Sequence, residues 1–121
     1  MDVNFADEKI KKLCEQSSLA QKKLGAKAAR KLKRRLADLL AARCVVELVA
    51  GRPHPVQPHK LGKRFYQKFS DVEELFALDL DGGVRLVFQA NVEPLPLKED
   101  ISLDWAKVSQ VCIVFIGDYH D

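Results

Sequence analysis

The end of the chain carries side chains that could transfer protons. Residues 111–116 form a continuous run of β-branched and aromatic residues, which is typical of a buried strand. The run stops at Gly117 and is followed by Asp118, Tyr119, His120 and Asp121. A carboxylate, a phenol and an imidazole at the lip of a sheet can exchange protons near neutral pH. The alternative is that Tyr119 only packs while His120 lies in solvent, so partners have to be sought elsewhere.

Other polar residues could complete such a site. His59 lies just ahead of the expected sheet and is followed by the cations Lys60, Lys63 and Arg64. Arg85 stands within an expected strand, where an arginine needs a partner. It either pairs with an acid such as Asp79 or projects from an open sheet face to bind an anion. His54, between two prolines, is more readily interpreted as an ordinary loop residue.

These residue types suit RNA cleavage without a metal. That reaction needs a base for the 2′-hydroxyl, cations for the phosphorane charge, and an acid for the departing 5′-oxygen. His59, Arg85, Tyr119 and His120 form such a set if the fold brings them together. Other chemistries fit poorly, because the Walker, dinucleotide-binding and HExxH motifs are missing and the serines lack a nucleophile-elbow context. We therefore expect neither a metal nor a cofactor.

Length and composition indicate one globular domain over residues 1–121. Hydrophobic residues make up 47% of the chain and charged residues 31%. Three scattered cysteines without CxxC spacing predict thiols in a reducing compartment rather than a metal site. No apolar run approaches the ~20 residues that span a bilayer, and the start of the chain lacks a secretion signal. These features predict a cytoplasmic protein without a membrane partner.

The charges are divided unequally along the chain. Residues 1–70 hold 17 Lys and Arg against 6 Asp and Glu, a net +11, whereas residues 71–121 hold 3 against 11, a net −8. The basic part includes one face of an expected helix, with Lys27, Arg30, Lys31 and Arg34. Nucleic acid is the commonest acidic partner of such a surface, although a solvated helix face gives the same count.

The hydrophobic pattern predicts the elements that would position these residues. We expect a strand at 3–5, helices over 7–14 and 19–43, a possible short helix at 47–49, a loop or edge segment at 51–60, a hairpin of strands 76–80 and 84–88, a loop over 91–104 and a last strand at 109–116. Gly25 is a weak point in the long helix but not a certain break. This order predicts an α+β domain, in which a short N-terminal strand and a helical hairpin pack on one face of a small twisted antiparallel sheet.

Several of these segments together match the pattern of a known family. They are the helix over 24–39, His59-Lys60-Leu61, the hairpin over 78–88, Asp104-Trp105, and the terminal run over 116–120. With them the chain resembles the RelE/ParE toxin superfamily, most closely its HigB-like or plasmid-killer branch. The resemblance covers nearly the whole chain, and its most specific parts are the hairpin and the terminal motif.

The resemblance implies a RelE-like fold and a toxin that cleaves mRNA on the ribosome until a cognate antitoxin inhibits it. It implies catalytic roles for His59, Asp118, Tyr119 and His120, and a phosphate contact for Arg85. The RNA-binding residues would be Lys60, Lys63, Arg64, Lys27, Arg30, Lys31 and Arg34. The chain departs from the family pattern at Lys63, which replaces an acid, and in an insertion over 65–75.

Two other functions stay open at this point. A ParE-like toxin would bind DNA gyrase without catalysis, and a decayed toxin would only bind its antitoxin. Retention of the Tyr119-His120 pair favours the nuclease, because a gyrase binder does not need it. If these terminal residues are exposed, as their position predicts, Tyr119→Phe or His120→Ala would leave stability nearly unchanged.

Overall fold

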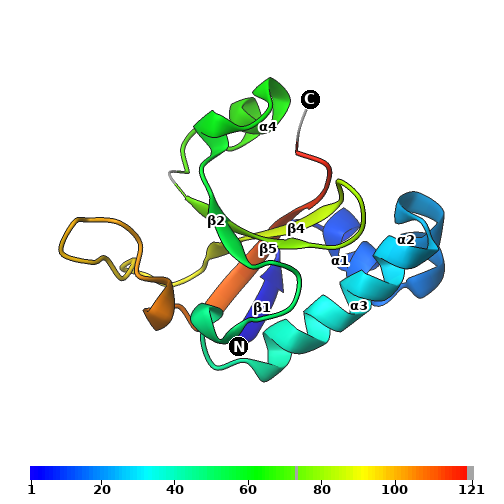
Figure 1. Cartoon of the computed structure of the whole chain (residues 1–121), viewed down its shortest axis with the longest axis horizontal. Coiled ribbons are helices and arrows are strands. Elements are labelled where there is room, and N and C mark those ends of the chain that lie inside the picture. Colours follow the sequence, from blue (N-terminus) through cyan, green and yellow to red (C-terminus); the bar gives the residue numbers. More distant parts are fainter. Residues whose placement is uncertain (73, 120–121) are drawn as a thin grey trace.

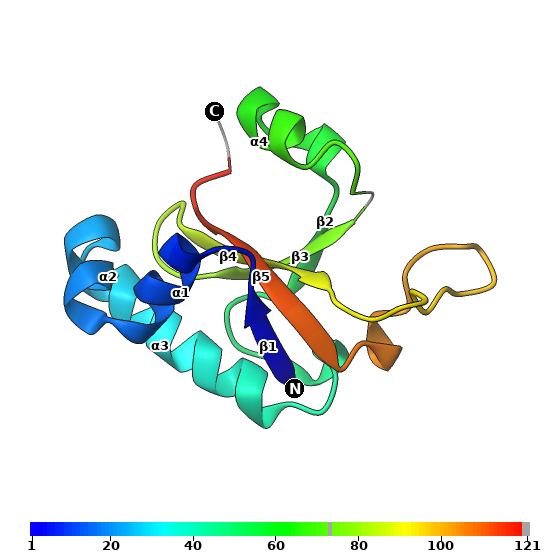
Figure 2. The ribbon, with the colours of Figure 1, turned by 180° about the vertical axis from the view of Figure 1, so that it is seen from behind.

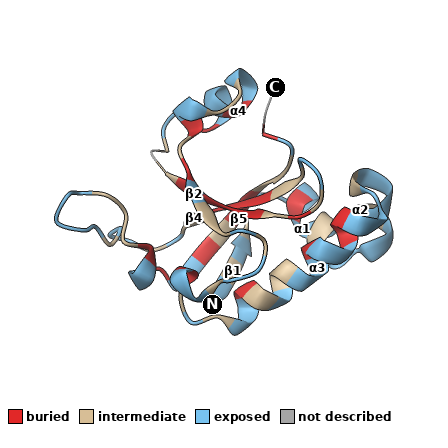
Figure 3. Ribbon diagram, viewed as in Figure 1, coloured by how far each residue is buried: buried red, intermediate tan, exposed pale blue. Residues whose placement is uncertain are grey.

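A computed structural model describes residues 1–72 and 74–119 of this α+β protein. One mixed sheet of five strands, in the order β1-β5-β4-β3-β2, forms its centre (Figure 1). The strands are β1 Asp2–Phe5, β2 His54–Val56, β3 Leu75–Asp79, β4 Arg85–Ala90 and β5 Gln110–Gly117. Buried residues concentrate in this sheet and on the helix sides that face it (Figure 3).

The first helix has the predicted length, whereas the long helix expected after it is divided in two. The helical segments are α1 Glu8–Glu15, α2 Ser17–Leu24, α3 Ala26–Ala41 and α4 Lys63–Lys68, with 3-10 turns η1 Val45–Glu47, η2 Pro58–Lys60 and η3 Trp105–Lys107. The expected helix over 19–43 is divided at Gly25, whose φ of +89° is left-handed and favours glycine. The side chain of Asp7 starts α1 by accepting a hydrogen bond from the Ile10 amide at 2.8 Å.

The first strand corrects the expectation of a purely antiparallel sheet. β1 lies parallel to β5, with Val3 opposite Val111 and Phe5 opposite Ile113, whereas the other three strand pairs are antiparallel. Helices α1, α2 and α3 follow β1 in the chain and pack against the sheet that β1 borders. The sequence pattern identified the strand, but it carries no information about the direction of its partner.

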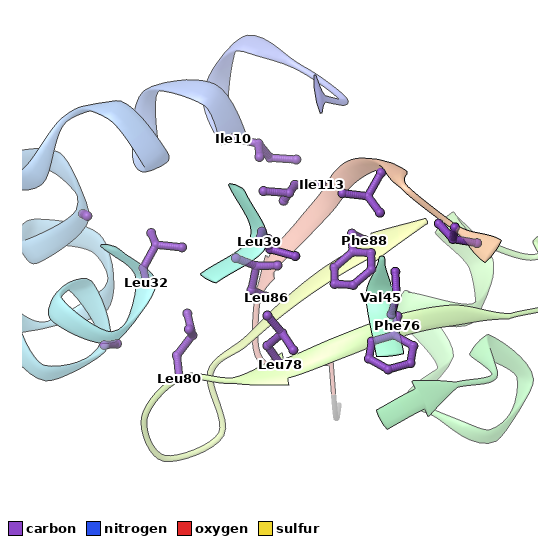
Figure 4. Packing of buried hydrophobic residues seen from close by; sticks show 14 of the residues in the cluster. Ile10, Leu32, Leu39, Val45, Phe76, Leu78, Leu80, Leu86, Phe88 and Ile113 are labelled. Atoms are coloured by element: carbon purple, nitrogen blue, oxygen red, sulfur yellow. The ribbon is translucent and has the colours of Figure 1, made fainter. Parts of the chain in front are cut away.

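Helices α1–α3 cover one face of the sheet and form the larger core. Apolar side chains from these helices meet side chains from β3, β4 and β5 there (Figure 4). The fully buried members include Leu32, Leu39, Leu86, Phe88 and Ile113. Phe76 stacks on Phe88 with ring centroids 5.4 Å apart, and Trp105 packs against Phe76 at 5.0 Å. Trp105 thus anchors the chain as it returns to the sheet.

The opposite face of the sheet carries a second, smaller core. Helix α4 overlaps the start of the 65–75 insertion. It places Phe65 and Phe69 against Ala77 and Val87 of the sheet, and against Tyr119 of the C-terminal segment, defined here as residues 118–119 after β5. Figure 1 and Figure 2 show α4 on the side of the sheet away from α1–α3. The expectation that helices pack on one face only is therefore wrong. This helix is not among the elements predicted from the sequence.

The central hairpin confirms the strongest local prediction. Strands β3 and β4 pair from Phe76 opposite Phe88 to Asp79 opposite Arg85, and a tight turn over 80–84 joins them. The turn closes through hydrogen bonds from the Leu80 amide to the Val84 carbonyl and from the Val84 amide to the Asp81 carbonyl. No helix in the described part of the chain is long and apolar enough to cross a membrane.

The cysteines are free and partly buried. Burial, together with the neighbouring Glu15 carboxylate, raises the pKa of the Cys14 thiol to about 12. Burial also raises the pKa of Cys112. Because the thiolate is the reactive form, both side chains behave as small apolar groups rather than as nucleophiles.

We expect Gly25→Ala to lower the free energy of unfolding by about 1–2 kcal/mol, because a Cβ at this left-handed residue is strained. In a continuous helix over 19–43 the same change would raise stability by about 1 kcal/mol. Urea unfolding therefore distinguishes the two arrangements by the sign of the change. Gly82→Ala is the matched control, since Gly82 is also left-handed with open space around it, and should also lower stability.

Candidate active site

Strand pairing brings polar side chains to one end of the face that α4 covers. His54 of β2 lies opposite Ala77 of β3, and Asp79 of β3 lies opposite Arg85 of β4. Because alternate residues share a face, these polar side chains extend the surface of the second core toward the β3–β4 turn. Tyr119 follows β5 and belongs to the same core.

Asp79 is shared between two arginines. Its Oδ2 accepts a hydrogen bond from Arg52 Nε at 2.8 Å, and its Oδ1 lies 2.7 Å from Arg85 Nε. The Arg85 N–H is not aligned for a hydrogen bond, so this second contact is an ion pair. The Arg52 side chain is 69% exposed, whereas that of Arg85 is only 13% exposed. Of the two alternatives for Arg85, the structure has the ion pair with Asp79.

The rest of the Arg85 guanidinium is also engaged. Its Nη1 donates to the Gly82 carbonyl at 2.9 Å and to the Val84 carbonyl at 3.3 Å. Its Cζ lies 5.8 Å from the centroid of the Tyr119 ring, within the range of a cation–π contact. Arg85 therefore holds the hairpin turn and the C-terminal segment together, and Arg52 is the more accessible guanidinium for an incoming anion.

His54 connects the same cluster to Tyr119. Its Nδ1 lies 2.6 Å from the Arg52 carbonyl oxygen, and its Nε2 lies 3.3 Å from Tyr119 Oη. A carbonyl only accepts, so Nδ1 must carry a hydrogen and the neutral ring presents an Nε2 lone pair toward the phenol. The turn that supplies the carbonyl is strained, because Arg52 has a φ of +48°, rare for a residue with a side chain.

Tyr119 is a core residue rather than an exposed terminal one. It is only 4% exposed, and its ring packs edge-on against Phe65 with centroids 5.6 Å apart. The expectation of an exposed Tyr119 is therefore wrong, because α4, formed within the insertion, provides an aromatic surface for the ring. Its hydroxyl still reaches the edge of the core, where it meets His54.

These contacts close into a ring of five side chains, defined here as the Arg52–Tyr119 cluster. The chain of contacts runs through Arg52, Asp79, Arg85, Tyr119 and His54, and returns to Arg52 through its carbonyl. With a neutral imidazole the cluster holds two positive charges and one negative charge. The exposed Arg52 guanidinium would meet an anion beside an imidazole and a phenol, the groups that stabilise and transfer charge in phosphoryl chemistry, while the Asp118 carboxylate lies nearby at Gly83 of the turn.

The segment with the other predicted residues lies beside this cluster. The Gly62 amide donates to the Tyr119 carbonyl at 3.3 Å, which joins the start of α4 to the C-terminal segment. The exposed residues on either side of Gly62 are His59, Lys60, Lys63 and Arg64. Their side chains thus lie on the segment that borders the cluster.

The remaining predicted residues fall into two groups. Asp118 is exposed, and its carboxylate lies so close to Gly83 that an added Cβ there would clash. His120 lies outside the described residues, so its role stays a prediction. On α3 the four cations predicted to bind RNA, Lys27, Arg30, Lys31 and Arg34, are exposed. Lys31 lies 3.6 Å from Asp81 and is partly neutralised by it.

Arg52 and His54 are the site residues that sequence reasoning missed. A signal for His54 was present, because Pro53 and Pro55 favour extended backbone and prolines are tolerated in an edge strand. His54 and Val56 then share a face, so an imidazole on the core side of the strand could have been inferred. Arg52 carries no comparable signal, since its place depends on a left-handed turn that the sequence marks only by Gly51.

Comparisons with known proteins add no family assignment. The chain has no significant match to a protein-family model, to a curated protein or to a solved structure. Within residues 1–72 and 74–119, no group of three or more His, Cys, Asp or Glu side chains is arranged to hold a metal ion.

Arg85→Ala should lower the free energy of unfolding by about 2–3 kcal/mol, because it removes a largely buried cation from Asp79 and from the Gly82 carbonyl. Arg52→Ala removes an exposed partner of the same carboxylate and should cost less than about 1 kcal/mol. Urea unfolding of both variants tests the ranking. Equal midpoints for wild type and Arg85→Ala would mean that this ion pair does not hold the hairpin to the C-terminal segment.

Proposed function

We propose that this protein is a RelE/ParE-type toxin of the HigB-like branch that cleaves mRNA on the ribosome. The observation that carries the proposal is the contact of His54 Nε2 with Tyr119 Oη beside the Arg52–Asp79–Arg85 ion pairs. An imidazole, a phenol and an accessible guanidinium within one cluster are the groups that metal-independent RNA cleavage requires. The hairpin and terminal motif that resemble the family supply two sides of this cluster.

The geometry suggests a division of roles. His54 Nε2 accepts the proton of the Tyr119 hydroxyl as that hydroxyl takes the proton of the ribose 2′-hydroxyl, and the resulting ribose oxygen attacks the adjacent phosphorus. The bond from phosphorus to the 5′-oxygen breaks as that oxygen takes a proton, leaving a 2′,3′-cyclic phosphate and a 5′-hydroxyl. Arg52 offers donors to the phosphorane oxygens, and the phenol of Tyr119 relays the proton to the imidazole through Oη. Arg85 acts through Tyr119 and Asp79, whose positions it holds.

The acid in this scheme is assigned from the resemblance. His120 follows Tyr119 directly and is the proposed donor to the departing oxygen, with Asp118 holding the tautomer of a neighbouring imidazole. His59 is the other candidate, because it lies on the exposed segment that borders the cluster. Lys60, Lys63 and Arg64 on that segment would bind phosphates on either side of the scissile bond.

The basic N-terminal helices suit a ribosomal partner. Exposed lysines and arginines of α3 would bind rRNA phosphates, with an affinity that falls as salt rises. A cognate antitoxin that covers the cluster or these helices would inhibit the toxin in the cytoplasm. The α+β architecture is compatible with this family, and the insertion that forms α4 is the feature particular to this chain.

One observation favours a second function. Tyr119 is only 4% exposed, so its hydroxyl meets a substrate poorly unless the C-terminal segment moves. A cluster whose members mainly support packing suits a non-catalytic toxin that acts by protein contact, such as a ParE-like gyrase binder. The two functions differ in whether His54 is needed for activity or only for the local fold.

His54→Ala should lower cleavage by ~10²–10⁴-fold, the usual contribution of a general base. The assay is primer extension on mRNA incubated with ribosomes and the purified protein, in the presence of EDTA. A His59→Ala variant is the comparison, since the resemblance implies a catalytic role for this exposed imidazole on the neighbouring segment. Thermal midpoints of both variants report whether either change disturbs folding.

Each result assigns a role. Loss in His54→Ala alone supports the base proposed here, and loss in His59→Ala alone supports the residue implied by the resemblance. Wild-type protein that cuts no mRNA but inhibits DNA supercoiling by gyrase would exclude the nuclease in favour of the second function.

Arg30→Glu combined with Arg34→Glu should weaken ribosome association and reduce the slope of log affinity against log salt by about 1–2, since each phosphate contact contributes about 0.7–0.9. Lys98→Glu combined with Lys107→Glu is the control with the same change in net charge, outside the helices. Sedimentation with ribosomes over a salt series measures both pairs. Identical salt slopes for wild type and the α3 variant would mean that this face is only solvated.

A further inference from the structure

A concave surface lies at the other end of the sheet from the Arg52–Tyr119 cluster. It is a cleft of about 800 Å³ between the C-terminal end of β4, the end of the 65–75 insertion and the loop over 91–104. Arg85 and Ala90 mark the two ends of β4, so the cleft and the cluster are separated by about 17 Å of strand. Figure 1 and Figure 2 show this loop projecting from the molecule on the side away from α1–α3.

The loop over 91–104 is held in one conformation by its own hydrogen bonds. Leu97 bridges to Leu103, the Lys98 amide donates to the Ser102 carbonyl at 2.8 Å, and the Asp104 amide donates to the Pro96 carbonyl at 2.8 Å. Ser102 Oγ donates to Asp100 at 2.6 Å, and this bond helps to lower the pKa of that carboxyl. The cleft wall is therefore formed before any partner arrives.

This ordered loop presents apolar side chains to solvent. Ile101 is 77% exposed and Leu97 is 54% exposed. Ile101 also has a φ of +64°, a left-handed conformation that is unfavourable for a β-branched residue. The loop thus holds Ile101 in a strained backbone conformation with its apolar side chain in water. Packing of the fold does not require this arrangement. Leu95, 48% exposed, belongs to the same wall.

The cleft has a uniform charge. Asp71, Glu74 and Glu93 contribute carboxylates to its lining, and none of the described lining residues is Lys, Arg or His. Three amides, those of Gln57, Gln89 and Asn91, add groups that bind peptide backbone. The carboxylates repel phosphate, so this surface does not suit RNA, whereas the cationic α3 does.

We propose that this cleft binds a basic amphipathic segment of a partner protein, with its apolar side chains against Leu97 and Ile101 and its lysines or arginines facing Asp71 and Glu93. Charge complementarity and the preformed apolar wall together define the occupant. The inference goes beyond the proposed function, because it concerns a separate surface and requires no cleavage of RNA. Its test reads peptide binding and is therefore independent of nuclease activity.

Fluorescence anisotropy with labelled twelve-residue peptides tests the proposal on the full-length protein. The probes alternate Leu with Lys, Leu with Glu, and Ser with Lys. We expect saturable binding of the Leu-Lys peptide, at least about tenfold weaker binding of the other two, and a similar loss for Leu97→Ser combined with Ile101→Ser, which removes the apolar anchors. Glu93→Lys should also weaken binding, more at low salt than at high salt.

Two controls keep the test specific to the cleft. Val49→Ser changes an apolar residue that is 87% exposed elsewhere on the surface and should leave binding unchanged. Amide chemical shifts on titration with the Leu-Lys peptide should change at residues 89–103 and not on α3. Equal affinity for the Leu-Glu peptide, unchanged binding in the double variant, or shifts centred on Val46 and Val49 would each overturn the proposal.

Discussion

The ion pair of Asp79 and Arg85 lies where three parts of the chain meet: strand β3, strand β4 and the residues that follow β5. It forms the last cross-strand pair of the β3–β4 hairpin, and the same guanidinium lies over the Tyr119 ring after β5. A cation that is only 13% exposed at the edge of an apolar core costs several kcal/mol unless a carboxylate compensates it. Asp79 supplies that charge and leaves its second oxygen for Arg52. One carboxylate therefore reinforces both the register of the hairpin, which backbone pairing also fixes, and the position of Tyr119, which aromatic packing also fixes.

The insertion over 65–75 changes what the C-terminal segment can do. Its helix covers the sheet face that would otherwise be open, and Phe65 and Phe69 draw the ring of Tyr119 into the core. Because the Tyr119 ring is buried, only its hydroxyl is available to a substrate. The same packing fixes the position of the His54 imidazole, because the imidazole is held between a backbone carbonyl and the phenol. Burial and preorganisation are thus two consequences of the same helix.

The two ends of the sheet differ in the chemistry they present. At the turn end, cations outnumber carboxylates in the Arg52–Tyr119 cluster, and the basic α3 lies on the opposite face of the sheet. At the other end, the 91–104 loop and the end of the insertion combine carboxylates with exposed apolar side chains. The unequal charge of the two parts of the chain therefore becomes a spatial separation of an anion-attracting surface from a cation-attracting one.

The sequence by itself determined the local elements whose signals lie within a few residues. Alternation and a Gly-Gly turn identify the hairpin, and an apolar run identifies β5. Asp79 was already a candidate partner of Arg85 in the sequence, because the predicted hairpin places the two residues near each other. Only the tertiary structure decided the parallel pairing of β1, the packing of α4 on the sheet, and the burial of Tyr119. Each of these depends on contacts between residues far apart in the chain, for which periodicity carries no signal. His54 is the intermediate case: its prolines indicate an extended strand, but its contact with Tyr119 exists only because the sheet brings β2 and the end of β5 to one face.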